Sequence, residues 1–375
     1  MGIYLILLTI NVSLGYAAIT AGWDYGATNF VAVLLTILFL ALMERWRPYR
    51  RDWHPTAREW RRDGLNFLLV FFAGALSQAA VTGVAVATAR STLGLPLLLE
   101  APLALAAASL VGYAFHRYSH ANRWLWMVHG IHHLPLKVNV ANNMVVHFIE
   151  VFASTVLTQL TLYMLGVSAE SALITGLFTP MQGYFIHANI DARMGWLNYV
   201  IACPEGHRMH HSRHVQEAGN FGSELAVWDS LFGTMTWRPG KVPATLGTDD
   251  EASFPSPFNI RDCVLYPLKG LVEILAQAAR SGLRGGQKAL HLAARLSSTV
   301  GVLVDLPDPT SAPGLVRCPP AAYVRPSDLR GALPRLTPRS LAACDARGPG
   351  RVAAPCVGPR REYPGSNPSG ATERP

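Results

Sequence analysis

The sequence is poor in cysteine and lacks the short motifs that bind nucleotides. Its five cysteines, Cys203, Cys263, Cys318, Cys344 and Cys356, show no CxxC spacing, so neither a disulfide framework nor a zinc ribbon is predicted. No GxGxxG fingerprint and no P-loop motif occurs. No DNA-binding pattern accompanies the formal charge of +8. We therefore expect no nucleic-acid partner and no bound dinucleotide.

Charged residues are also scarce. They make up 15% of the 375 residues, against 50% hydrophobic residues, and the mean hydropathy is +0.22. This composition is too apolar for an ordinary soluble enzyme. The first apolar run lacks the basic start and cleavage site of a signal peptide. We predict an all-α integral-membrane bundle with four to six apolar segments, at residues 3–22, 30–43, 65–88, 103–115, 144–165 and 172–185.

The basic residues lie between the apolar segments. Seven arginines occur between Glu44 and Asp63, interleaved with three tryptophans. The loops 23–29 and 166–170 contain no lysine or arginine. By the positive-inside rule the arginine-rich segment is cytoplasmic, and its tryptophans suit the headgroup level of the membrane. The alternative is a solvated charge run without a membrane role.

Histidine is concentrated in three short motifs, HRYSH at 116–120, HGIHH at 129–133 and HRMHH at 207–211. Residues three or four apart on a helix project from one face, so each motif aims two or three imidazoles at one point. Neutral imidazole is a common metal ligand, and these imidazoles exceed what one ion needs. The expected ligands of two metal ions are His116, His120, His129, His132, His133, His207, His210 and His211.

Other interpretations of the histidines remain open. Of the 13 histidines, all but His54 and His291 fall between residues 116 and 214, which argues against scattered structural roles. A membrane cytochrome would place its haem ligands deep within the spans, whereas the adjacent pairs here lie near span ends. A transporter would also place its ligands inside spans. A zinc hydrolase is the remaining alternative, since imidazole suits zinc as well as iron.

The three motifs and their order resemble the fatty acid hydroxylase and sterol desaturase superfamily of integral-membrane di-iron enzymes. The resemblance covers roughly residues 30 to 240. It is supported by the arginine-rich segment, Asn143 with His147, His187-Ala-Asn189, Pro204-Glu205, Asn220-Phe-Gly222 and Trp228-Asp229. It implies a cytoplasmic helical cap that holds two iron ions. It also implies O2-dependent hydroxylation, or desaturation, of a lipid such as a sterol, hopanoid or fatty acyl chain.

The resemblance also suggests residues outside the three motifs. His187 is expected as a ninth ligand. Some members of the superfamily place an HxxxH pair here, and the matching positions are His187 and Asp191. Asp191 would then ligate metal, orient a histidine or cap a helix. Asn143, His147 and His214 are expected to contact the ligands rather than the metal, with direct ligation as the alternative for His147 and His214.

Electrons for such a reaction would come from another protein. The sequence lacks an iron–sulfur cysteine pattern and the HPGG motif of fused cytochrome b5 domains. The implied donor is a separate reductase, cytochrome b5 or ferredoxin, and the basic cytoplasmic face suits an acidic carrier.

The sequence divides into four regions. We expect transmembrane helices in residues 1–100, the catalytic domain in 101–240 and a cytoplasmic segment in 241–305, with an amphipathic helix at 268–280. Residues 306–375 are rich in proline, glycine, arginine and alanine without periodicity, so we expect them to be disordered.

Overall fold

A computed structural model describes residues 1–88 and 91–280, the last five of them by backbone alone. This part of the chain is helical and contains no strand beyond two isolated bridges. His291, the three cysteines after residue 300, residues 281–305 of the predicted cytoplasmic segment and the predicted disordered region 306–375 lie outside it. The helices are α1 Gly2–Ala21, α2 Tyr25–Trp46, η1 Arg51–Trp53, α3 Ala57–Ala87, α4 Leu97–Ala121, α5 Arg123–His129, η2 Gly130–His133, η3 Ala141–Met144, α6 Phe148–Met164, α7 Ala169–His187, η4 Gly195–Tyr199, α8 Pro204–His210, α9 Val227–Leu231, η5 Glu251–Ser253 and α10 Ile260–Arg280.

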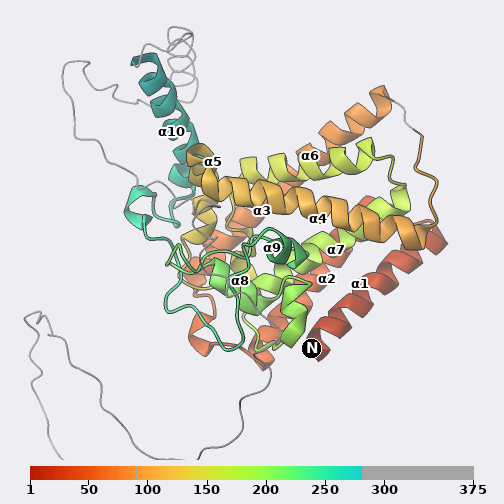
Figure 1. Cartoon of the computed structure of the whole chain (residues 1–375), viewed down its shortest axis with the longest axis horizontal. Coiled ribbons are helices and arrows are strands. Elements are labelled where there is room, and N and C mark those ends of the chain that lie inside the picture. Colours follow the sequence, from red (N-terminus) through yellow and green to blue (C-terminus); the bar gives the residue numbers. More distant parts are fainter. Residues whose placement is uncertain (89–90, 281–375) are drawn as a thin grey trace, which may run out of the picture. The chain divides into compact units, whose positions relative to one another are not determined.

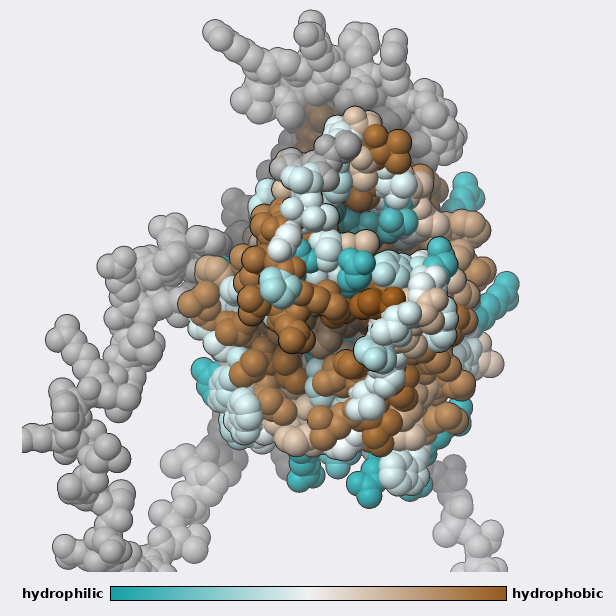
Figure 2. Space-filling model, turned by 90° about the vertical axis from the view of Figure 1, so that its right-hand side faces the viewer, coloured by the Kyte–Doolittle hydropathy of each residue, from teal (hydrophilic) through white to brown (hydrophobic). Residues whose placement is uncertain are grey.

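Four helices are long and apolar enough to cross a membrane, namely α1, α2, α3 and α4. Most residues in their apolar windows are not buried against the rest of the protein, as expected of helices that face lipid. Figure 2 shows hydrophobic residues gathered over much of the face at the right-hand side of Figure 1. The predicted all-α membrane bundle is confirmed.

Two helix boundaries differ from the prediction. Helix α3 begins at Ala57 and not near residue 65, because Thr56 and Glu59 form a capping box that starts the helix within the arginine-rich segment. Helix α4 begins at Leu97 and not at residue 103, and it contains Pro102. Pro102 is the sixth residue of the helix, so its missing N–H removes one backbone hydrogen bond, to Leu98 O, and the helix continues past it.

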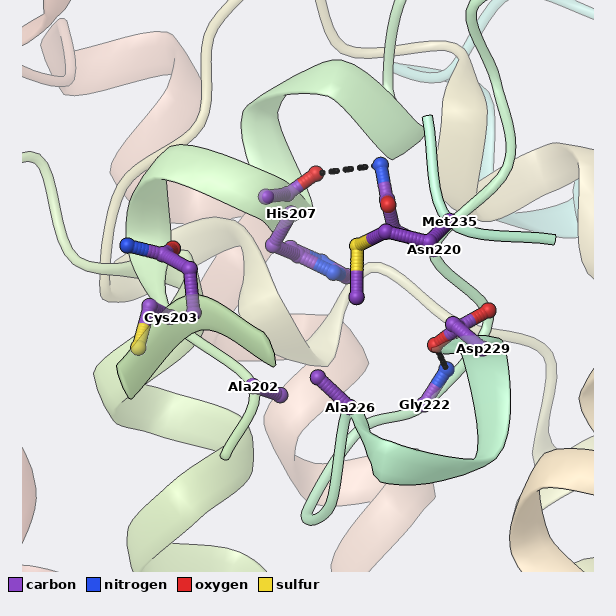
Figure 3. A pocket seen from close by; sticks show the side chains of 10 residues that line it. Ala202, Cys203, His207, Asn220, Gly222, Ala226, Asp229 and Met235 are labelled. Carbon is purple, nitrogen blue, oxygen red and sulfur yellow. Dashed lines mark hydrogen bonds between the residues drawn. The ribbon is translucent and has the colours of Figure 1, made fainter. Parts of the chain in front are cut away.

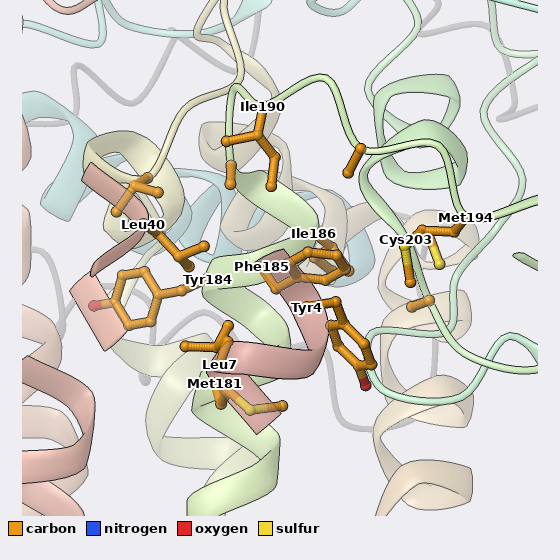
Figure 4. Close-up of a cluster of buried hydrophobic side chains, with 14 residues drawn as sticks. Tyr4, Leu7, Leu40, Met181, Tyr184, Phe185, Ile186, Ile190, Met194 and Cys203 are labelled. Atoms are coloured by element: carbon orange, nitrogen blue, oxygen red, sulfur yellow. The ribbon is translucent and has the colours of Figure 1, made fainter. Parts of the chain in front are cut away.

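Helix α7 lies among α1, α2 and α4, and helix α6 packs on α3 and α4. The main buried cluster joins Tyr4 and Leu7 of α1, Leu40 of α2 and Phe185 of α7 (Figure 4). The Phe185 side chain is fully buried, and its ring centroid lies 4.7 Å from that of Tyr4. This packing fixes the last turn of α7, where His187 stands.

The segments that follow α2 and α7 are connected at the same end of the bundle. The buried Glu44 carboxylate, in the last turn of α2, accepts hydrogen bonds from the Val140 and Asn189 backbone N–H groups, both at 2.7 Å. The Asn189 side chain pairs with both backbone groups of Arg50. Arg62 is also buried, in an ion pair with Asp63 at 2.6 Å. The arginine-rich segment is therefore anchored to the fold through its backbone and through Arg62, whereas its other six arginines are exposed.

Candidate metal centre

Nine histidines converge at this end of the bundle, and they fall into two groups. In each group the candidate ligand atoms all lie within 4.8 Å of one another. The five-histidine group contains His116, His120, His129, His133 and His210. The four-histidine group contains His132, His187, His207 and His211. The structure thus brings together the eight histidines of the three motifs and also His187.

Helical spacing explains how each motif divides. His129 and His133 are four residues apart, as are His207 and His211, and each pair joins one group. Their neighbours His132 and His210 are rotated by roughly 100° around the helix axis and reach the other group. The second and third motifs therefore each contribute to both groups.

The imidazole nitrogens are spaced as ligands of one ion would be. In the five-histidine group the Nε2 atom of His129 lies 3.1 Å from those of His116 and His133. In the four-histidine group the Nε2 atom of His187 lies 3.1 Å from that of His132 and 3.2 Å from that of His211, which lies 3.1 Å from that of His207. Ligands bound at about 2.0–2.1 Å lie roughly 2.8–3.0 Å apart in octahedral geometry and roughly 3.3–3.4 Å apart in tetrahedral geometry.

In several histidines the Nδ1 atom lies within hydrogen-bond distance of a carbonyl or carboxylate oxygen, which can only accept. A carbonyl or carboxylate opposite Nδ1 requires Nδ1 to donate, which leaves the Nε2 lone pair free for a metal. The partners are Phe221 O for His116 (2.7 Å), Glu150 Oε1 for His129 (2.7 Å), Val145 O for His132 (3.1 Å), Asn142 Oδ1 for His187 (3.3 Å) and Gly219 O for His210 (3.0 Å).

Burial keeps these imidazoles neutral. It lowers the pKa of His129 and of His132 to about 3, and it lowers the pKa of His207 and His211 as well. A neutral imidazole is the form that binds metal. The Nε2 atoms of His120 and His210 are buried without a hydrogen-bond partner, which is costly unless a ligand meets them. The residues therefore fit metal ions.

Four residues expected near the ligands belong to neither group. Helix α7 ends at His187, so Asp191 is not one turn further along the same face. Asp191 is exposed, pairs with Arg193 at 3.5 Å, and caps no helix among those described. His147 caps α6 by accepting from Ile149 N (3.2 Å), and His214 is exposed. Asn143 is half-buried beside Asn142.

Two residues in contact with the histidines were not expected from the sequence. Asn142 contacts His187 where Asn143 had been expected, a difference of one residue in a short 3-10 helix. Glu150 contacts His129, and its Oε2 atom is buried without a partner. Glu150 is the one carboxylate in the apolar run 144–165, and an isolated charge in such a run is a signal of function.

Fold and site together define a helical membrane protein with two adjacent histidine groups that fit metal. Residues 101–234, which include all nine histidines, match the model of the family described as fatty acid hydroxylase. The ornithine lipid hydroxylase OlsE of Rhizobium tropici is 31% identical over 232 residues, 58% of this chain and 70% of that protein. The chain belongs to the fatty acid hydroxylase family.

Other similar proteins are alkylglycerol monooxygenases. The protein from Xenopus tropicalis is 27% identical over 154 residues, which is 41% of this chain and 34% of that protein. The one from Homo sapiens is 24% identical over 131 residues, or 35% and 29%. No solved structure matches. The named relatives are hydroxylases and monooxygenases, which supports oxidative hydroxylation of a membrane lipid as the general activity.

Proposed function

We propose that the protein hydroxylates a membrane lipid with O2, using two iron ions, one in each histidine group. The observation that carries the proposal is the convergence of nine neutral imidazoles into groups of five and four. Imidazole suits zinc as well as iron. Iron is favoured over zinc because the relatives are named as a hydroxylase and a monooxygenase, and zinc is redox-inert.

The protein residues would hold and shape this centre. The nine imidazoles supply the ligands, and their Nδ1 hydrogen bonds fix the ring orientations. Glu150 adds negative charge behind His129 and makes that ring a stronger donor to metal. When bound, the iron pair supplies the activation of O2 that attacks a C–H bond. Burial of the histidines limits the access of bulk water.

The reaction needs electrons that the lipid does not supply. One oxygen atom of O2 enters the C–H bond as a hydroxyl group and the other leaves as water, so two electrons and two protons are consumed. We propose a separate reductase, cytochrome b5 or ferredoxin as donor. Arg45, Arg47 and Arg51 lie at the metal end of the bundle and would attract an acidic carrier.

We propose a polar lipid of the surrounding bilayer as substrate, with ornithine lipids as the first class to test. The name of the bacterial relative supports this choice, and it places hydroxylation ahead of desaturation. The match to the alkylglycerol monooxygenases covers about a third of those proteins, so it supports only the reaction type.

We also propose that the metal end of the bundle faces the cytoplasm. Residues 1–100 then form the N-terminal membrane helices, and residues 101–240 form the catalytic domain. The seven arginines between Glu44 and Asp63 support this orientation. Single cysteines at the exposed positions Ala57 and His214 should react from the cytoplasmic side, and one at Thr92 from the opposite side. Labelling of Ala57→Cys and His214→Cys from different sides would contradict it.

The test of the function is turnover by the metal-loaded protein in lipid. Purified protein should carry close to two metal ions per chain, as expected for two histidine groups. Supplied with a reductant, it should consume O2 and add one oxygen to an ornithine lipid or another bilayer lipid, as seen by mass spectrometry. A haem absorption band, or two bound irons without any oxidised lipid, would refute the proposal. Two zinc ions would require reloading with iron, because zinc can replace it.

A further inference from the structure

Residues 220–237, here called the returning segment, run back along α4. The Trp228 indole N–H and the Leu225 backbone N–H both donate to the Ser109 hydroxyl, at 3.1 and 3.3 Å. The Phe232 ring stacks on Tyr113 with centroids 5.5 Å apart. Ser109 lies about 12 Å along the helix axis from Arg117, the nearest charged residue toward the metal end. The returning segment therefore reaches the apolar part of a candidate membrane span.

Irregular backbone at membrane depth is stable only if its polar groups are satisfied within the protein. The Asp229 carboxylate accepts from the Phe221 and Gly222 N–H groups, both at 2.8 Å, and from the Thr234 hydroxyl at 2.6 Å. The Asn220 side chain accepts from the N–H groups of Thr236 (3.0 Å) and Trp237 (3.2 Å). The segment thus folds its polar groups inward.

Its outward edge is apolar. Val227, Leu231 and Phe232 are 38%, 67% and 48% exposed. Tyr199 and Val200, at the end of η4, are also exposed, and the Val227 N–H donates to Val200 O at 3.3 Å. These five residues are called the apolar rim. Polar groups inside and large apolar side chains outside are the reverse of a loop that faces water.

The inner side of the returning segment lines a small pocket that reaches His207 (Figure 3). Its opposite wall comes from η4, α8 and the residues between them. The small residues Ala202, Gly206, Gly222 and Ala226 line it, and a Cβ atom at Gly222 would clash with Leu225 O. Its carboxylate and one of its amides, Asp229 and Asn220, are already engaged in the hydrogen bonds described above.

We propose that the returning segment dips into the bilayer, that the apolar rim contacts lipid acyl chains, and that a hydrocarbon chain passes from this rim into the pocket beside His207. The occupant is a bilayer lipid because the rim lies beside the apolar part of α4. Passage to His207 rests on the proposed function, whereas contact with the membrane does not.

Depth-dependent quenching tests the membrane contact. Single cysteines replace Leu231 or Val242 in a chain whose five native cysteines are removed and whose metal content is unchanged. Val242 is the matched control, being 59% exposed and next to Lys241, which pairs with Glu217. In lipid nanodiscs, a fluorophore at position 231 should be quenched several-fold more by nitroxide on acyl chains than one at 242. Iodide in the water should show the opposite order.

Equal quenching of both positions by iodide would overturn the membrane contact. So would a position 231 shielded from both quenchers that cross-links to a second copy, because the rim would then be a protein interface. Neither outcome depends on enzyme activity.

A second experiment tests the path to the metal. Leu231→Glu places a charge on the rim without disturbing the core, because this side chain is 67% exposed. Turnover of vesicle lipid should fall on the order of tenfold with metal content unchanged, whereas Val242→Glu should retain full turnover. Unchanged turnover in Leu231→Glu would overturn the path. If the unaltered protein shows no hydroxylation, the proposed function fails while the quenching result stands.

Discussion

The two histidine groups differ in size and in the residues that support them. The five-histidine group is held by the Glu150 carboxylate behind His129 and by backbone carbonyls behind His116 and His210. The four-histidine group is held by the neutral Asn142 amide behind His187 and by one carbonyl behind His132. A carboxylate strengthens an imidazole as a ligand more than an amide does. We therefore expect the five-histidine group to bind its ion more tightly.

The two groups are also mechanically linked. The turn from α5 into η2 carries His129 and His133 to one group and His132 to the other, and α8 divides in the same way. A displacement of either element moves ligands in both groups. Removal of a ligand and removal of a supporting residue test whether the groups are unequal and coupled, whereas acid and truncation test the site as a whole.

The largest effect is expected from removing a ligand. His132→Ala leaves three imidazoles in its group and His210→Ala leaves four, so both should lose turnover by a factor of roughly 100 or more. Metal analysis should find the greater loss of metal in His132→Ala. His214→Ala, which replaces an exposed histidine outside both groups, is the control. Full metal and full activity in His132→Ala would place the site elsewhere.

The supporting residues should have a smaller and selective effect. Glu150→Gln keeps an acceptor beside His129 but removes its charge, and should weaken metal binding at the five-histidine group about 10- to 100-fold. Asn142→Ala should affect the four-histidine group instead. Competition with a metal chelator measures both, with the exposed Glu273→Gln as control. Identical chelator profiles for the two variants would show that the groups are not distinguishable.

Acid should destabilise the metal-free protein. Burial lowers the pKa of His129 and of His132 to about 3, whereas an unfolded histidine titrates near 6.5. Between these values the unfolded chain binds protons that the folded chain does not, so the free energy of unfolding falls as the pH falls. Each such histidine contributes up to about 1.4 kcal/mol per pH unit.

Melting curves of the metal-free protein between pH 7.5 and pH 5 test this expectation. Bound metal should raise the melting temperature throughout and should be released toward the acid end, because protons compete with metal for the same nitrogens. A melting temperature that rises on acidification would show that these histidines are charged in the folded protein.

The smallest effect is expected from removing residues 306–375. This region has no histidine and no periodic apolar face, so metal content and turnover should stay within about twofold of the full chain. A truncation after residue 240 is the contrasting variant. It removes the Asp250 carboxylate that accepts from the Trp126 indole N–H at 3.0 Å and the Pro267 carbonyl that accepts from Trp124 at 3.1 Å. This shorter chain should have a disturbed α5 and should lose metal. Full metal in the chain cut after residue 240, with loss of metal in the chain cut after residue 305, would show that the catalytic region was wrongly assigned.

Much of the fold and the site was predictable from local sequence. Runs of apolar residues fix membrane helices because the bilayer demands both length and hydrophobicity. The spacing within HRYSH, HGIHH and HRMHH places imidazoles on common faces because the helical repeat is local geometry. Helices α1 to α4 lie where the apolar runs predicted membrane helices, and only the helix ends differ from the prediction.

The tertiary structure decided which histidine serves which group and what stands behind each ring. His132 and His133 are neighbours in sequence, yet they enter different groups: His133 joins His116 and His120 of α4, whereas His132 joins His187 of α7 and His207 of α8. Because α7 ends at His187, Asp191 does not lie on the same helical face as His187. The packing of α6 places Glu150 in contact with His129. These outcomes depend on long-range packing, which a spacing pattern within one segment cannot encode.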